Sequence, residues 1–178
     1  MKSFKFLFLS LFLSFAISCS SSDDDNGDTG SGEVDAELVD MWIGSTVNYS
    51  GTSVTEIQGV SLTADFVGEG YDIDFTFNFT ENPNILTAEG SYSIELTTTI
   101  QGQSTVQNIE DLGFENSGTW SRDGDELSLT YDGTTDVASI TELTATTLIL
   151  NIFKVEVTEV NGATTTITTD SYFTFTRQ

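Results

Sequence analysis

This sequence contains few types of side chain that could take part in chemistry. The 178 residues include no histidine and a single cysteine, Cys19, while aspartate and glutamate together number 28. The lack of histidine excludes catalytic triads that use this base, as well as His-ligated zinc and haem sites. No Gly-x-Ser-x-Gly or Ser-x-x-Lys pattern accompanies the serines. The remaining reactive groups are the Cys19 thiol and pairs of carboxylates.

Pairs of carboxylates occur two residues apart in the chain. Asp72 and Asp74 share one face of a predicted strand, and Asp123 and Asp125 flank a predicted turn. Glycoside hydrolysis needs two carboxylates about 5–10 Å apart across the sugar. In so acidic a chain such neighbours arise on nearly every strand, and a solvated outer face accounts for them. We therefore predict no catalytic residue, no metal site and no cofactor, and we expect that the protein is not an enzyme.

The first 18 residues have the pattern of an export signal. Lys2 and Lys5 precede an apolar run from Phe6 to Ile17, and a serine then separates this run from Cys19. The run is too short to span a bilayer core of about 30 Å. A basic start, a short apolar stretch and small residues before a cleavage point are typical of a secretory signal peptide. We predict that residues 1–18 are removed.

Cys19, directly after the predicted cleavage point, resembles the lipobox cysteine of bacterial lipoproteins. The resemblance implies that the sulfur and the new amino group of Cys19 carry acyl chains such as palmitate, which anchor the protein in a membrane. Each buried methylene contributes about 0.8 kcal/mol, so several chains anchor firmly where one would not. Because Cys19 is the only cysteine, no disulfide can form within the chain.

Residues 19–35 are predicted to form a lipidated, acidic and disordered tether. Residues 20–35 contain one apolar side chain, too few to offset the entropy of ordering the chain. Residues 22–33 partly match a calcium-binding EF-hand loop, but Ser22 stands at its first position and no flanking helix is predicted, so we expect no calcium site. The acidic run after Cys19 resembles the export signals of surface lipoproteins in some Gram-negative bacteria. We expect a cell-envelope protein anchored in the outer membrane, with its outer and periplasmic faces left as alternatives.

The charge of the mature chain limits its partners. Cleavage before Cys19 removes two of the five basic residues and no acid, which leaves 3 basic against 28 acidic residues and a net charge of −25. Such a surface repels phosphate backbones and anionic headgroups. We therefore expect no nucleic-acid binding, whereas cations and neutral ligands such as lipids and glycans remain compatible with this charge.

Residues 36–178 are predicted to form one all-β domain. Threonine, valine, isoleucine and aromatic residues dominate, apolar and polar side chains alternate, and proline occurs once. Turn signals at residues 81–84, 123–124 and 161–162 divide long alternating runs, so consecutive hairpins are expected. We predict an up-and-down antiparallel barrel of eight to ten strands, with a β-sandwich as the alternative and one helical turn at residues 36–41. Gly90, on an apolar face, predicts a bend or bulge.

Four segments of this domain resemble the lipocalin-like domains of Gram-negative lipoproteins. Leu-Val-Asp-Met-Trp at residues 38–42 stands where lipocalins carry Gly-x-Trp, with Asp40 in place of the glycine. Residues 118–130 resemble that family's hairpin, residues 140–150 its next strand pair, and residues 172–177 its closing strand with a terminal arginine. The resemblance implies a small closed barrel with an apolar interior cavity.

Trp42 and Arg177 form the most specific candidate pair. In an eight-stranded meander the last strand closes against the first, so the start of one lies beside the end of the other. Arg177 shares parity with Phe173 and Phe175 and should point inward, where an arginine over an indole contributes about 0.5–2 kcal/mol. We predict that the pair plugs one barrel end, as the analogous pair does in lipocalins. A bulge near Gly44 is then required.

Aromatic side chains on the inward faces are the candidate lining of a ligand cavity. An alternative is that they fill an ordinary core, as side chains do in many small barrels. Two functions follow: a binding module for a small apolar or amphipathic ligand, or a non-enzymatic structural or interaction module with a filled core. The candidate lining residues are Phe75, Phe77, Phe79, Tyr92, Trp120, Phe173 and Phe175.

Overall fold

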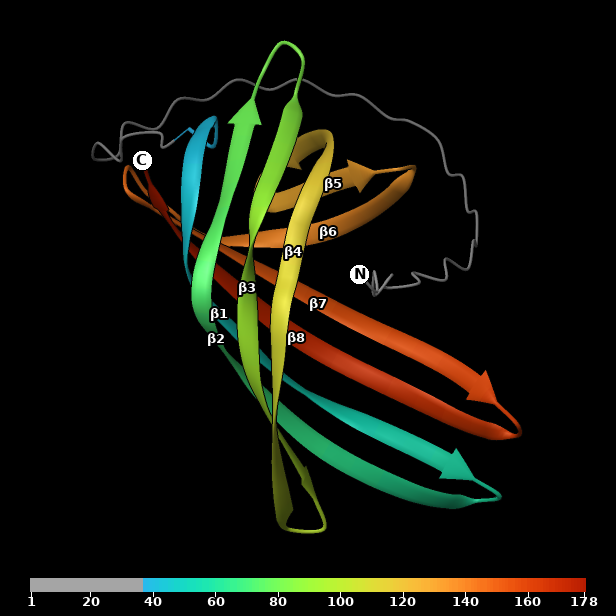
Figure 1. The fold of residues 1–178 in the computed structure, drawn as a ribbon. Helices are drawn as coiled ribbons and strands as arrows, with labels where there is room; N and C mark the ends of the chain where they lie inside the picture. Colours follow the sequence, from blue (N-terminus) through green and yellow to red (C-terminus); the bar gives the residue numbers. More distant parts are fainter. Residues whose placement is uncertain (1–36) are drawn as a thin grey trace, which may run out of the picture. The chain divides into compact units, whose positions relative to one another are not determined.

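A computed structural model describes residues 37–178, apart from the side chains of Glu115 and Asn116. This part of the chain forms eight antiparallel strands (Figure 1). Each strand pairs with the next, and β8 pairs with β1, so the sheet closes into a barrel. The predicted up-and-down barrel is thereby confirmed, and the sandwich alternative was wrong. The predicted signal peptide and tether lie outside the described residues. The strands are β1 (Asp40–Ile57), β2 (Val60–Thr80), β3 (Ile85–Ile100), β4 (Gln103–Asp123), β5 (Glu126–Tyr131), β6 (Thr134–Leu143), β7 (Thr147–Val160) and β8 (Ala163–Arg177).

Three long hairpins give the barrel two different ends. The β1–β2, β3–β4 and β7–β8 hairpins extend well past the short β5–β6 hairpin (Figure 1). We call their far ends the tips, and the opposite end, where β1 begins and β8 finishes, the base. The tips turn at Gln58-Gly59, Gln101-Gly102 and Asn161-Gly162, where both residues have positive φ. That conformation suits the two-residue type I′ turn, which glycine and asparagine tolerate best.

The short β5 and β6 leave long stretches of their neighbours without a second partner. β4 pairs with β5 only over Thr119–Asp123, and β6 pairs with β7 only from Ser139 to Leu143. Within the described part of the chain, the earlier residues of β4 and the later residues of β7 therefore have a strand on one side only. The base is ringed by eight strands, whereas six of them continue toward the tips.

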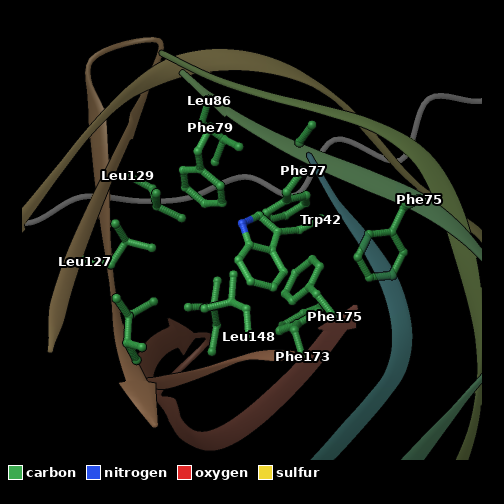
Figure 2. Packing of buried hydrophobic residues seen from close by; sticks show 14 of the residues in the cluster. Trp42, Phe75, Phe77, Phe79, Leu86, Leu127, Leu129, Leu148, Phe173 and Phe175 are labelled. Carbon is green, nitrogen blue, oxygen red and sulfur yellow. The ribbon is translucent and has the colours of Figure 1, made fainter. Parts of the chain in front are cut away.

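The hydrophobic core lies toward the base. Trp42, Phe75, Phe79 and Phe175 are almost completely buried there, and leucines from β3, β5 and β7 surround them (Figure 2). Each fully buried side chain of this kind contributes about 1.5–3 kcal/mol relative to an exposed one. Inward and outward residues alternate along each strand, which explains why a sequence rich in alternating Phe and Thr folds this way.

Bulges and a bent glycine let the strands curve around this core. The β1–β8 ladder shifts register between Gly44 and Thr46, so the bulge that Trp42 and Val47 require to face inward together is present. Gly90 has φ +97°, and an added Cβ would lie 2.0 Å from the backbone oxygen of Asp74. The predicted irregularity at Gly90 is thus a close approach between β3 and the bulge of β2.

Two sequence expectations about elements were wrong. The described part of the predicted helical turn at residues 36–41 contains no helix, and β1 begins at Asp40. The upper end of the predicted range of eight to ten strands was also too high, since residues 60–80 form the single strand β2, in which the bulge between Tyr71 and Asp74 shifts the alternation without ending the strand. Within residues 37–178, no helix is long and apolar enough to cross a membrane.

Candidate functional site

Arg177 and Trp42 meet at the base of the barrel. The two residues are directly opposite in the β1–β8 ladder, and the Arg177 guanidinium carbon lies 4.4 Å from the centroid of the Trp42 ring. The indole Nε1 donates a hydrogen bond of 2.8 Å to the Leu38 carbonyl oxygen. The tryptophan is fully buried, whereas the arginine side chain keeps about a fifth of its surface exposed. The structure therefore brings the predicted pair together, with the arginine as the outer layer.

Asp40 fixes the position of the arginine. Arg177 Nη1 donates to Asp40 Oδ2 over 2.8 Å, and Nη2 donates to the Glu37 carbonyl oxygen over 2.6 Å. Asp40 also accepts a hydrogen bond from the Met41 backbone amide. That amide and the guanidinium hold the pKa of the Asp40 carboxyl below its usual value. The aspartate that stands where lipocalins have glycine therefore has a local role, because it orients the closing arginine.

The predicted cavity-lining side chains pack mostly against one another. Rings of Phe75 and Phe77 lie 5.8 Å apart, and each also contacts Phe175 at 5.6 and 5.0 Å (Figure 2). Tyr92 and Phe173 join the same cluster from β3 and β8. These rings occupy the interior together, because aromatic side chains of β2, β3 and β8 converge there.

Trp120 lies at the edge of this cluster. Its ring contacts Phe79 at 5.9 Å, and its Nε1 donates to the Thr80 carbonyl oxygen over 2.9 Å. The side chain thus joins β4 to the end of β2 near the base. This placement makes Trp120 part of the packing between strands and not a wall of the groove described below.

Two tyrosines form the polar upper layer of the aromatic cluster. The hydroxyl groups of Tyr49 on β1 and Tyr92 on β3 hydrogen-bond to each other across the interior, and the Tyr49 ring contacts Phe173 at 6.0 Å. Burial, with the neighbouring phenol of Tyr92, raises the pKa of Tyr49 well above its usual range. Burial likewise raises the pKa of Tyr92. Both phenols therefore stay protonated, and each hydroxyl group can donate a hydrogen bond to the other or accept one from it.

A groove of about 640 Å³ lies on the inner face of the β3–β4 tip. Its walls are uncharged: hydroxyl and amide side chains surround one aliphatic residue. No charged residue occurs between Glu95 and Glu110, the whole span of this tip, in a chain that has 28 acids. Such a lining can donate and accept hydrogen bonds while offering apolar contact. The residues that line the groove are Thr98, Ile100, Gln101, Gln103, Thr105 and Gln107.

Lys154 and Asp136 connect strands that no longer share a ladder. Lys154 Nζ lies 2.8 Å from Asp136 Oδ1, and each side chain is about one third exposed. The β6–β7 ladder stops at Ser139 and Asn151, so this ion pair spans the region where β6 leaves β7. Burial, with the charge of Asp136 nearby, raises the pKa of Tyr131 beyond its usual range.

The carboxylates of both sequence pairs lie at the exposed surface of the barrel. Asp72 and Asp74 are both exposed, and Asp72 occupies the bulge of β2 with φ +47°. Asp123 and Asp125 are exposed on either side of the β4–β5 turn. Across residues 37–178, no three His, Cys, Asp or Glu side chains converge in a way that could hold a metal ion.

Sequence reasoning missed the features that distinguish the tip end. The groove residues carry no motif, since threonine, glutamine and isoleucine are ordinary strand residues. A usable signal was present, because 14 consecutive residues lack charge in a strongly acidic sequence. The Tyr49–Tyr92 hydrogen bond had no such signal, since it depends on the closure of the barrel.

Comparison with known proteins agrees with this architecture. A family model described as a lipocalin-like domain matches residues 38–150, which include Trp42, the β3–β4 groove and the β6–β7 connection. Neither the curated proteins nor the solved structures gave a match. The matched segment covers more than half of the sequence and most of the barrel. The chain therefore belongs to the lipocalin-like domain family.

Proposed function

We propose that this protein is a lipid-anchored lipoprotein of the cell envelope whose barrel binds a small, uncharged amphipathic ligand at the tip end. Domains of this family are generally binding proteins without catalytic activity. The groove on the β3–β4 hairpin carries the proposal, because it is a hollow of ligand size beside an interior that aromatic rings occupy at the base.

The lining of the groove limits the chemistry of the ligand. Thr98 and Thr105 offer hydroxyl groups, Gln103 and Gln107 offer amides, and Ile100 gives an aliphatic contact. These groups satisfy hydroxyl, ether or amide functions but give no counter-ion to a charged ligand. The acidic surface repels anions as they approach. A neutral molecule with both polar and apolar parts fits these conditions.

Binding of an uncharged amphipathic dye tests the groove directly. N-phenyl-1-naphthylamine should gain fluorescence on titration with the protein, and Thr98→Trp should reduce the affinity about tenfold or more, because it fills the groove. Thr99→Trp is the matched control, since the neighbouring threonine faces outward on the same strand and does not line the groove. Equal affinity in both variants would refute this position for the ligand.

The anchor part of the proposal rests on Cys19 and its flanking sequence. Replacing the cysteine with serine removes the acceptor for the acyl chains, so Cys19→Ser should lose labelled palmitate and move from the membrane to the soluble fraction. Proteinase treatment of intact cells that carry the unchanged protein would distinguish the two faces of the outer membrane, because only a protein on the outer face is accessible to the proteinase. A Cys19→Ser variant that stays membrane-bound would contradict lipid anchoring.

A second candidate function is supported by the packed aromatic cluster. An interior occupied by side chains suits a non-enzymatic structural or interaction module, whose work is done by its outer surface and tips. This alternative predicts that mass spectrometry of extracts from the purified protein finds no co-purifying small molecule, and that the dye does not bind. A reproducible co-purifying neutral amphiphile would favour the binding module.

A further inference from the structure

The first part of β4 is an open strand edge. β4 pairs with β3 from Gln103 onward, but on its other side the ladder to β5 begins only at Thr119. In the described chain, residues 103–118 therefore present backbone N–H and C=O groups without a strand on that side. Such an edge is a template for pairing with another chain unless charge, proline or a covering segment blocks it.

The two open edges of this barrel are protected differently. The later part of β7 carries Lys154, Glu156 and Glu159 along its edge, and charges of this kind disfavour pairing. The β4 edge carries no charge from Gln103 to Ile109 and no proline. Val106 stands at the middle of this window, faces away from the groove and is 55% exposed. The unprotected edge is therefore the one that a partner strand can meet.

We infer that this edge of β4 pairs antiparallel with the same edge of a second copy of the chain. A two-fold axis at Val106 places that residue opposite itself, Thr105 opposite Gln107, and Gln103 opposite Ile109. Residues of the inner face then lie opposite residues of the inner face, as a shared sheet requires. The seven residues of the uncharged window pair completely with their counterparts.

Charge restricts where two copies can meet. Each molecule carries a net charge of −23, so two copies repel each other across most of their surfaces, and this repulsion is least along the uncharged edge from Gln103 to Ile109. In the proposed register, Glu110 and Asp111 of one copy lie opposite Gly102 and Gln101 of the other, and no acid faces an acid. The bulge between Ile109 and Leu112 ends the straight edge at the same point.

The pairing is closed and stops at two copies. The other side of β4 is already bonded to β3, so each copy has this edge to use once. An isologous contact of this type gives a dimer, whereas a head-to-tail contact would give a fibre. The two β3–β4 tips would form one continuous sheet, with a groove from each copy on the same face.

Single-cysteine cross-linking tests the position of the axis. The full chain with Cys19→Ser, purified in mild detergent, would carry either Val106→Cys or Val67→Cys. Val67 is the matched control, because it lies in the same row across β2, β3 and β4, is 54% exposed and has a strand on both sides. A short bismaleimide should give covalent dimer with Val106→Cys and leave Val67→Cys as monomer.

Charge at the axis gives a second, independent measurement. Val106→Glu would place two carboxylates opposite each other, so sedimentation velocity should show loss of the dimer, whereas Val67→Glu should retain it. Circular dichroism melts establish that each variant is folded. Equal cross-linking of the two cysteine variants, a monomeric parent protein, oligomers larger than two, or a Val106→Glu variant that stays dimeric would each overturn the inference.

Discussion

Arg177 holds the two ends of the described chain together. It stacks on Trp42 of β1 and hydrogen-bonds to Asp40 and to the Glu37 carbonyl, so three contacts depend on one side chain close to the C-terminus. A guanidinium suits this position better than an ammonium, because its planar fork can stack and donate in two directions at once. The residue therefore matters for stability through geometry as well as charge.

We predict that Arg177→Ala lowers the free energy of unfolding by about 2 kcal/mol, from the loss of the cation–π contact and of the charged hydrogen bonds. Arg177→Lys should recover part of this loss. Arg122→Ala is the control, since Arg122 is exposed and bonds only to a nearby turn carbonyl, and it should cost less than about 0.5 kcal/mol. Urea unfolding measures all three. Equal losses for the two alanine variants would contradict the proposed plug.

The Tyr49–Tyr92 pair predicts instability at alkaline pH. Burial raises the pKa of both phenols above the usual value of 10.0, so the unfolded chain releases these protons before the folded chain does. The contribution of this pair to stability is then constant below about pH 10 and falls as the pH rises further. Urea unfolding between about pH 8 and 11 should show this decline, with a shallower slope for Tyr49→Phe. The same slope in the parent protein and in Tyr49→Phe would contradict the assignment.

At the scale of elements, glycines fall into two groups according to what surrounds them. Gly90 lies in the interior of β3 against the backbone of β2, whereas Gly102 lies at a tip turn with nothing near its missing side chain. Both have positive φ, so an alanine at either position meets the same type of backbone strain. A comparison of the stability lost by an alanine variant at each position therefore measures the effect of the close approach of β2 and β3.

Gly90→Ala should therefore destabilise the barrel by about 3 kcal/mol or more, and Gly102→Ala by about 1 kcal/mol. The added methyl group at Gly90 would collide with the Asp74 oxygen and the Phe75 Cα atom, which belong to backbone and cannot rotate away. Thermal and urea unfolding of the two variants provide the test. Similar losses would mean that β2 and β3 can separate at the bulge without penalty.

The alternation of apolar and polar residues predicted most of the strands, but few of the residues at which they begin and end. Phe75, Phe77 and Phe79 face inward as their spacing indicates. The lengths of β2 and β4 were not predictable, because a bulge and a true strand end both interrupt alternation in the same way. The outcome is decided by whether the neighbouring strand continues, which is information from outside the segment.

At the scale of the whole molecule, negative charge opposes the folded state. Folding brings together 22 of the 28 carboxylates with three cations in residues 37–178, and two of these cations are already in ion pairs with Asp136 and Asp40. The remaining repulsion acts over distances that salt can screen, since the Debye length falls from about 30 Å at 0.01 M to about 8 Å at 0.15 M. Ionic strength should therefore change stability.

We predict that the melting temperature rises by several degrees between about 10 and 150 mM sodium chloride. Choline chloride should have the same effect, because screening does not depend on the identity of the cation. A rise with one salt alone would indicate specific cation binding, and a constant or falling melting temperature would contradict net repulsion.

The sequence by itself determined the class of fold and excluded histidine chemistry, and it predicts an export signal followed by an acceptor cysteine. These follow from composition, period and local order, which need no knowledge of distant contacts. Trp42 and Arg177 were also predictable as partners, because closing an even-numbered meander places the first and last strands together.

The tertiary structure decided what the inward-facing aromatic residues do. Whether Phe77 lines a space or fills one depends on Phe175, which follows it by almost a hundred residues and meets it only when the barrel closes. The tertiary structure also decided which strand edges lack a partner strand, because β5 and β6 are too short to cover the edges of β4 and β7. Alternation specifies a face for each side chain, but the volume between faces and the partner at each edge arise from the packing of all eight strands.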